Sequence, residues 1–280
     1  MMYIQVLSKG AFFRYYVLAG AYDASQRFTQ ESSMKKKDPG IFITEGIEKY
    51  MHMVQTVYAD TLVMAALYGS AATGSYVYGI SDINLLLVVD PPSPSKLFDL
   101  GERTFKIVGK YRITPHVLSK SELLGSADVF PVEYLEISST MDLIYGDNLF
   151  EQLDISRKNL RHQVEAMLRG EINSLRQIIL AASAKEKLFG RELQQWAGRQ
   201  FTLYRALLNL AGEKEKSGHT DVRLVTDDLA EIFSLSVTPF HDMEDIREGI
   251  KLSKSHKEVV SSLLKEYITM AEKVDGPTYR

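Results

Sequence analysis

The residues of this sequence that are best suited to chemistry lie where two apolar runs border one polar loop. The first run stops at Gly69 and Ser70, and the second opens at Asp82 and Asn84. Residues two apart on a strand point to the same side. We therefore expect Asp82 and Asn84 to project together, next to the loop that begins at Gly69.

These residue types favour a nucleotide site. A glycine at such a turn lets backbone amides approach an anion closely, and the hydroxyl of Ser70 adds a donor. Asp82 and Asn84 offer the oxygen ligands that Mg²⁺ prefers. Together they predict a turn that holds phosphates beside a pair of magnesium ligands. The structural alternative for Asp82 is an acid that only caps a turn at the start of a strand.

The same segment resembles the nucleotidyltransferase superfamily, which has the fold of DNA polymerase beta. Gly69 and Ser70 match its glycine-serine element, and Asp82 matches its first metal carboxylate. Ser81 stands where a serine often precedes that carboxylate. The order of the domains further resembles kanamycin-type and minimal nucleotidyltransferases, in which such a domain is followed by a helical bundle.

The resemblance implies a fold class and a reaction. The fold class is α+β, with a mixed sheet and its helices followed by an all-α bundle. In the reaction, a hydroxyl of a small molecule or protein attacks the α-phosphorus of ATP or another nucleoside triphosphate, and pyrophosphate leaves. Asp82 and Asn84 would hold Mg²⁺, while Gly69, Ser70 and Ser81 would bind the nucleotide. Two divalent ions neutralise the developing charge in this chemistry.

The sequence departs from the family pattern at two positions. Asn84 replaces the second carboxylate and brings no negative charge to a metal. The strand expected to supply a third carboxylate has no acid, and offers His116 and the oppositely charged Arg112 instead. Two hypotheses therefore stand side by side: a magnesium-dependent nucleotidyltransferase with a partly degenerate site, and a catalytically inactive module that binds a nucleotide or a protein.

Composition excludes several other classes. The 280 residues are 45% hydrophobic and 25% charged, which is typical of a globular protein and not of a disordered one. Acidic residues number 36 against 33 basic ones, so net charge provides no drive toward nucleic acid or an anionic membrane. Without cysteine, thiolate metal sites are excluded. The apolar stretch at residues 10–22 is too short to span a bilayer. We expect a cytoplasmic protein whose partners are a nucleotide, an acceptor and, in a homodimer, a second copy.

Periodicity divides the chain into three parts. Residues 1–43 are a basic, turn-rich extension or linker to which we assign no role. Residues 44–150 form the nucleotidyltransferase-like domain, which begins with a helix from Thr44. Its strands are expected at residues 62–68, 83–89, 112–118 and, more weakly, 132–137 and 141–145, with a helix at 93–109. Pro115 indicates that the strand at 112–118 either lies at the edge of the sheet or has a break in its ladder.

Residues 151–280 carry only helical patterns. Apolar positions at spacings of three and four predict a bundle of four or five helices, and one of these is expected to stop at Gly212. Trp196 lies in an apolar stripe and is expected in the core rather than at a binding surface.

Overall fold

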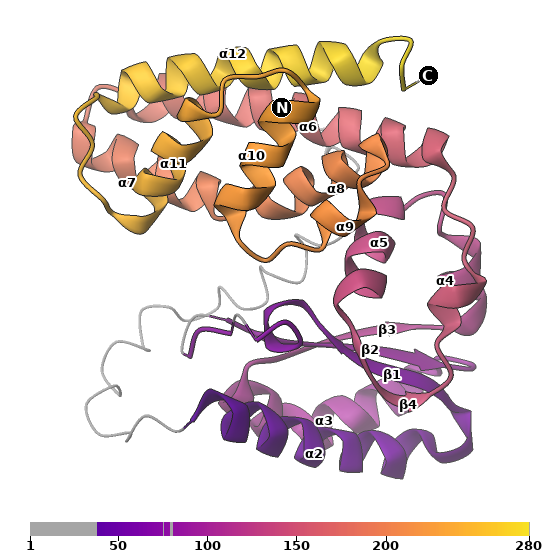
Figure 1. Cartoon of the computed structure of the whole chain (residues 1–280). Helices are drawn as coiled ribbons and strands as arrows, with labels where there is room; N and C mark the ends of the chain where they lie inside the picture. The colour runs from indigo at the N-terminus through magenta and orange to yellow at the C-terminus, as the bar shows by residue number, and fades with distance from the viewer. Residues whose placement is uncertain (1–37, 75, 79–80, 280) are drawn as a thin grey trace, which may run out of the picture. The chain divides into compact units, whose positions relative to one another are not determined.

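The computed structural model describes residues 38–74, 76–78 and 81–279, which form two compact units (Figure 1). The first unit contains the described residues up to Gly125 together with Thr140–Leu153. The second contains Ser126–Ser139 and the chain from Asp154 onward. The first unit holds the sheet and the second is helical, so the predicted α+β class is confirmed.

The first unit is built on a four-stranded mixed sheet. Its strands are β1 (Leu62–Tyr68), β2 (Ile83–Val89), β3 (Ile113–Leu118) and β4 (Asp142–Gly146), in the order β3-β2-β1-β4. β1 pairs antiparallel with both β2 and β4, whereas β2 and β3 are parallel. The strands expected near residues 62, 83, 112 and 141 are thus present. Pro115 lies on the edge strand β3, as its missing N–H requires.

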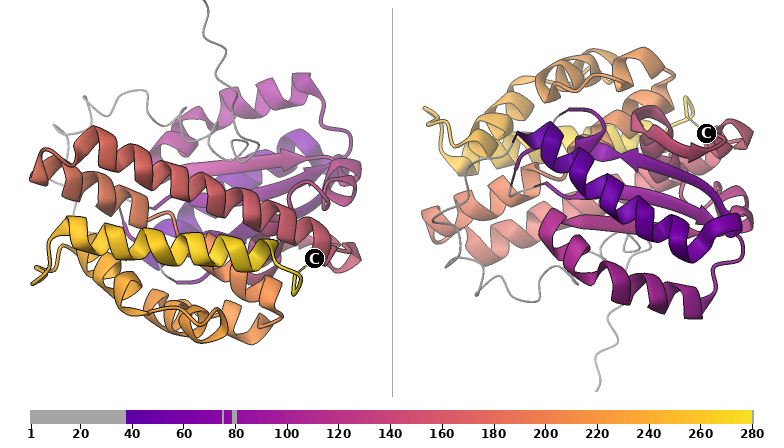
Figure 2. Two further views of the ribbon diagram at one scale, coloured as in Figure 1. Left: turned by 90° about the horizontal axis from the view of Figure 1, so that it is seen from above. Right: turned by 90° about the horizontal axis from the view of Figure 1, so that it is seen from below.

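Two long helices, α2 (Pro39–Tyr58) and α3 (Pro94–Tyr111), cover one face of this sheet (Figure 1). They lie side by side, as the right-hand view of Figure 2 shows. α2 begins before the predicted Thr44. The side chain of Asp38 accepts hydrogen bonds from the amides of Gly40 (2.8 Å) and Ile41 (3.4 Å), and Pro39 suits the first turn because its missing N–H is not needed there.

In the core of the first unit, alternate residues of β2 face the two helices. On β2, Ile83, Leu85, Leu87 and Val89 are fully buried and pack with residues of α2 and α3. Short segments complete the unit: η2 (Ala59–Thr61), η3 (Gly69–Ala71), α4 (Lys120–Gly125) and η4 (Leu149–Gln152). β2 is thus buried and paired on both sides, which positions the residues at its start.

The strand predicted at residues 132–137 is wrong, because this segment is the helix α5 (Pro131–Thr140) of the second unit. Val132 is buried in the bundle core, and its amide donates to Oε1 of Gln163 at 2.9 Å, which caps the start of the helix. Pro131 at the start also favours a helix. Tertiary packing has overridden the strand propensity of the branched and aromatic residues.

The second unit contains more helices than the predicted four or five. Besides α5, its described residues form α6 (Arg157–Ala182), α7 (Glu186–Ala197), α8 (Phe201–Ala211), α9 (Lys214–Ser217), α10 (Val222–Ile232), α11 (Thr238–Glu248) and α12 (His256–Asp275). α6 and α12 run beside each other, as the left-hand view of Figure 2 shows. α8 ends at Gly212, whose φ of +93° confirms the predicted stop.

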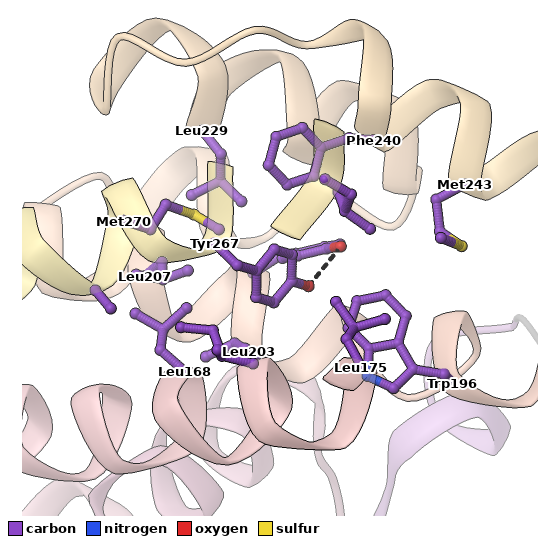
Figure 3. Close-up of a cluster of buried hydrophobic side chains, with 14 of the residues drawn as sticks. Leu168, Leu175, Trp196, Leu203, Leu207, Leu229, Phe240, Met243, Tyr267 and Met270 are labelled. Atoms are coloured by element: carbon purple, nitrogen blue, oxygen red, sulfur yellow. Dashed lines mark hydrogen bonds between the residues drawn. The ribbon is translucent and has the colours of Figure 1, made fainter. Parts of the chain in front are cut away.

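The bundle core encloses a small hydrogen-bonded network of polar groups among apolar side chains (Figure 3). Trp196 is fully buried, as predicted, and its ring packs 5.4 Å from that of Tyr267. The Tyr267 hydroxyl lies 2.8 Å from that of Tyr204 and 3.0 Å from Oε1 of Gln200. Buried hydroxyls are costly unless they are hydrogen-bonded, so this network fixes α8 against α12. No helix in the described part of the chain has both the length and the apolar character that crossing a membrane requires.

Candidate functional site

The site predicted from the sequence begins where β1 ends. Gly69 has a φ of +73°, a conformation that other residues adopt only with strain. Its carbonyl accepts hydrogen bonds from the amides of Ala72 (3.0 Å) and Thr73 (3.1 Å), which closes a tight turn that also contains the half-buried Ser70. The backbone conformation of this turn therefore favours glycine at position 69.

Gly69 and Asn84 are close neighbours. A Cβ atom added to Gly69 would lie 3.0 Å from Nδ2 of Asn84. Tyr68, the residue before the glycine, pairs with Asn84 in the β1–β2 ladder. The structure therefore brings together the turn and one of the two predicted metal ligands.

Ser81 has a local role. Its hydroxyl oxygen accepts a hydrogen bond from the Val77 amide at 3.0 Å, and its own amide donates to the Val77 carbonyl at 2.8 Å. These bonds close the loop directly before Asp82. Ser81 thus helps to position Asp82.

Asp82 is paired with a cation from the residue that joins α3 to β3. Both Nε (3.0 Å) and Nη2 (2.9 Å) of Arg112 donate to the same oxygen, Oδ1 of Asp82. Arg112 ends α3 with a φ of +55° and precedes the first residue of β3. Its carbonyl accepts from the amide of Ile83 at 2.9 Å. Backbone and side chain together hold Arg112 beside the entry to β2.

The β2–β3 register explains this pairing. The two parallel strands are aligned with a constant offset, from Ile83 opposite Ile113 to Val88 opposite Leu118. Asp82 and Arg112 occupy the next position before the ladder. One step inside it, Asn84 stands opposite Thr114. Asp82 therefore has a guanidinium beside it, from Arg112 directly before β3, and Asn84 has the hydroxyl of Thr114 opposite it.

Two tyrosines of the loop lie against this part of the unit. The ring of Tyr78 packs edge-on against Phe42 of α2, with 5.0 Å between the ring centroids. Tyr76 is 8% exposed, and its hydroxyl has no hydrogen-bond partner among the described residues. Burial raises the pKa of Tyr76, while Arg112 lowers it and Asp82 raises it, so the hydroxyl lies within electrostatic range of the ion pair.

These residues fit a pair of divalent ions poorly. Asp82 is already neutralised by Arg112, and Asn84 and Thr114 are uncharged. The described residues contain no group of three or more acids and histidines that could hold a metal ion. Two nearby acids in the sequence have other partners: Asp99 binds Arg103 at 2.7 Å, and Glu122 accepts from the Ser119 amide at 2.7 Å. A two-metal centre needs several anionic ligands.

Arg112 and Thr114 are the site residues that sequence reasoning did not assign. Arg112 stands out in the sequence only as a charge of the wrong sign for a metal site. The signal that identifies its role is the offset between the two parallel strands, because the same spacing that pairs Asn84 with Thr114 also pairs Asp82 with Arg112. That offset is fixed by the sheet and cannot be read from the residue types.

Comparison with known proteins gives little information about function. No family model matches the chain, and no curated protein matches it. Nine chains of solved structures match. One of them is spectinomycin adenyltransferase AAD(9) from Enterococcus faecialis, crystallised with ATP and spectinomycin. It is 15% identical in sequence with a TM-score of 0.49, and the match covers 83% of this chain and 99% of that one. This degree of similarity leaves the function to be argued from the residues themselves.

Proposed function

We propose that this protein binds the phosphates of a nucleoside triphosphate at the turn of Gly69 and Ser70, and that it lacks two-metal nucleotidyl transfer. The observation that carries the proposal is the ion pair between Asp82 and Arg112. This pair supplies a positive charge at the same end of the sheet as the glycine turn. It also occupies the carboxylate on which a metal would depend.

The positive charge supports anion binding at this end of the sheet. A guanidinium recognises phosphate oxygens with two parallel N–H donors, and a glycine turn allows close approach of backbone amides. Asn84 adds a side-chain amide next to Gly69. Ser70, Asn84 and Arg112 are therefore the residues we assign to phosphate binding, with Tyr76 beside them.

The missing anionic charge argues against transfer. In two-metal transfer the ions neutralise the attacking and leaving oxygens, and they must themselves be held by carboxylates. Here the charge of Asp82 is balanced by Arg112, and the facing positions Asn84 and Thr114 bring none. The inactive-module hypothesis thus fits these residues better than the enzyme hypothesis.

A nuclear magnetic resonance titration tests the binding proposal. Addition of ATP should shift the amide signals of Gly69, Ser70 and Asn84, whereas those of Gly212 and Gly249 in the helical unit should stay in place. Those two glycines are suitable controls because each also has a positive φ, but each only ends a helix and belongs to no proposed binding site. Absence of shifts at Gly69 and Ser70 under saturating ATP would overturn the proposal.

Magnesium-dependent transfer is the second candidate, and one observation favours it. The Asp82 side chain is 46% exposed, so a metal ion could reach it if Arg112 moved away. ATP, or another nucleoside triphosphate, would then be the substrate, Mg²⁺ the cofactor, and a hydroxyl of a small molecule or protein the acceptor. Release of pyrophosphate from ATP that requires Mg²⁺ and is lost in Asp82→Ala would establish this candidate over the first.

A further inference from the structure

The side chain of Arg112 occupies the place that a cation would take at Asp82. Its Nε and Nη2 atoms lie 3.0 Å and 2.9 Å from Oδ1 of Asp82. The backbone of Arg112 is fixed as well, because its carbonyl accepts a hydrogen bond from the amide of Ile83 at the start of β2. A positive charge is thus part of the protein at the point where nucleotide sites often recruit a metal ion.

We infer that Arg112 replaces the divalent cation, so that the site binds a nucleoside triphosphate free of metal. The inference rests on the proposed function and specifies the form of its ligand. A metal bridges a carboxylate and the phosphates by binding both. Arg112 can do the same, because a guanidinium offers several N–H donors arranged in one plane.

The pair is accessible enough for a ligand to reach. The side chains of Arg112 and Asp82 are 33% and 46% exposed, and ion pairs with this much solvent contact are weak. A triphosphate can therefore share the guanidinium with Asp82 or displace the carboxylate. The buried hydroxyl of Tyr76, which has no partner among the described residues, supplies a second polar group within electrostatic range of the pair.

Asp82 takes a different role in this scheme. Instead of ligating a metal, it holds the guanidinium in position when no nucleotide is bound. Its negative charge repels the incoming phosphates, so removing that charge should strengthen binding. In a metal-dependent site the same change has the opposite effect. Loss of the carboxylate there abolishes the nucleotide binding that depends on Mg²⁺. The two schemes therefore predict opposite effects of the same substitution.

The experiment measures ATP affinity by calorimetry in EDTA and in excess Mg²⁺, for the wild type, Arg112→Gln and Asp82→Asn. The wild type should bind with affinities that differ by less than about threefold between the two conditions. Arg112→Gln should lose about tenfold to a hundredfold in EDTA, the usual effect of removing a charge-assisted hydrogen bond, and should regain much of it with Mg²⁺, because Asp82 is then free. Asp82→Asn should bind at least as tightly as the wild type in EDTA.

Arg103→Gln is the matched control. Arg103 makes a similar exposed pair with Asp99 on α3, so its loss tests for a general effect of removing an arginine near this helix. It should bind ATP like the wild type. Circular dichroism of each variant establishes that it is folded.

The outcomes separate the inference from the proposed function. Wild-type protein that binds no ATP in either condition overturns both. Wild-type protein that binds ATP only with Mg²⁺, or Arg112→Gln that binds in EDTA as well as the wild type, overturns the inference and leaves nucleotide binding in place. If Arg112→Gln does not fold, the ATP affinity of Asp82→Asn in EDTA tests the inference. Weaker binding than in the wild type would contradict it.

Discussion

Asn84 and Thr114 stand opposite each other in the parallel β2–β3 ladder, and neither side chain carries a charge. Paired residues in a parallel ladder present their side chains on the same face of the sheet. Substituting both positions together therefore tests whether the site lacks only anionic metal ligands. Introducing carboxylates at these two positions should give the site the negative charge that Mg²⁺ binding requires, while the backbone stays in place.

The double substitution Asn84→Asp and Thr114→Asp should create a magnesium site together with Asp82. A ligand that binds only the folded state stabilises it, by about 1.4 kcal/mol when its concentration is ten times its Kd. Thermal unfolding with and without Mg²⁺ should show this gain in the double variant and none in the wild type. Equal stabilisation of the wild type by Mg²⁺ would show that the present residues already bind the ion.

Gly69→Ala should destabilise the protein and weaken ATP binding. The φ of +73° costs an alanine about 1–2 kcal/mol, and the new Cβ would press on Asn84 at 3.0 Å. Gly74→Ala is the matched control, since Gly74 has a φ of +75° but open space around its missing Cβ. Denaturant unfolding measures the strain in both variants, and ATP binding should suffer only in Gly69→Ala. A similar loss of binding in both variants would contradict a specific role for the Gly69 turn.

Tyr267→Phe should reduce the free energy of unfolding by about 1–3 kcal/mol, because it leaves the buried oxygens of Tyr204 and Gln200 without their partner. Tyr58→Phe is the comparison, since the Tyr58 hydroxyl is buried without a hydrogen-bond partner among the described residues. Its removal should be neutral or stabilising. Urea unfolding followed by circular dichroism measures both changes, and an equal effect of the two substitutions would be at odds with the bonding network.

His116 should make stability depend on pH. Burial on β3 lowers the pKa of His116 below its ordinary 6.5, so the unfolded chain binds a proton more readily than the folded one. The contribution to stability is therefore complete above pH 6.5 and is lost as the pH falls below that value, by at most about 1.4 kcal/mol for each pH unit.

Urea unfolding between pH 7.5 and 5.5 checks this dependence by comparing the wild type with His116→Gln, in which that part of the slope should vanish. His52→Gln is the control, because His52 is exposed on α2. It controls for the removal of a histidine from the first unit. An unchanged slope in His116→Gln would mean that His116 does not titrate in the way its burial requires.

Much of the first unit could be predicted from local patterns. The apolar runs of β1 and β2 are long and end at clear turn residues, so their positions are evident. Pro115 identifies an edge strand because proline lacks a ladder donor. The segment at 132–137 could not be assigned correctly, since its branched and aromatic residues favour a strand and only packing in the bundle, with the Gln163 cap, makes it a helix.

The candidate site was predictable only in part. Gly69, Ser70, Asp82 and Asn84 are identified by type and spacing within one short segment. Arg112 comes from the far end of another helix and meets Asp82 through the register of the sheet. Since register depends on how whole strands pack, the ion pair that changes the meaning of Asp82 could not be seen in the residues alone. The expected homodimer stays a prediction.

The affinity of the wild-type protein for ATP in EDTA tests the central claim most directly. A guanidinium built into the site predicts saturable binding of one ATP per chain without any divalent ion, changed by less than about threefold when Mg²⁺ is added. No binding in EDTA, with binding restored by Mg²⁺, would contradict the account and return Asp82 to the role of a metal ligand.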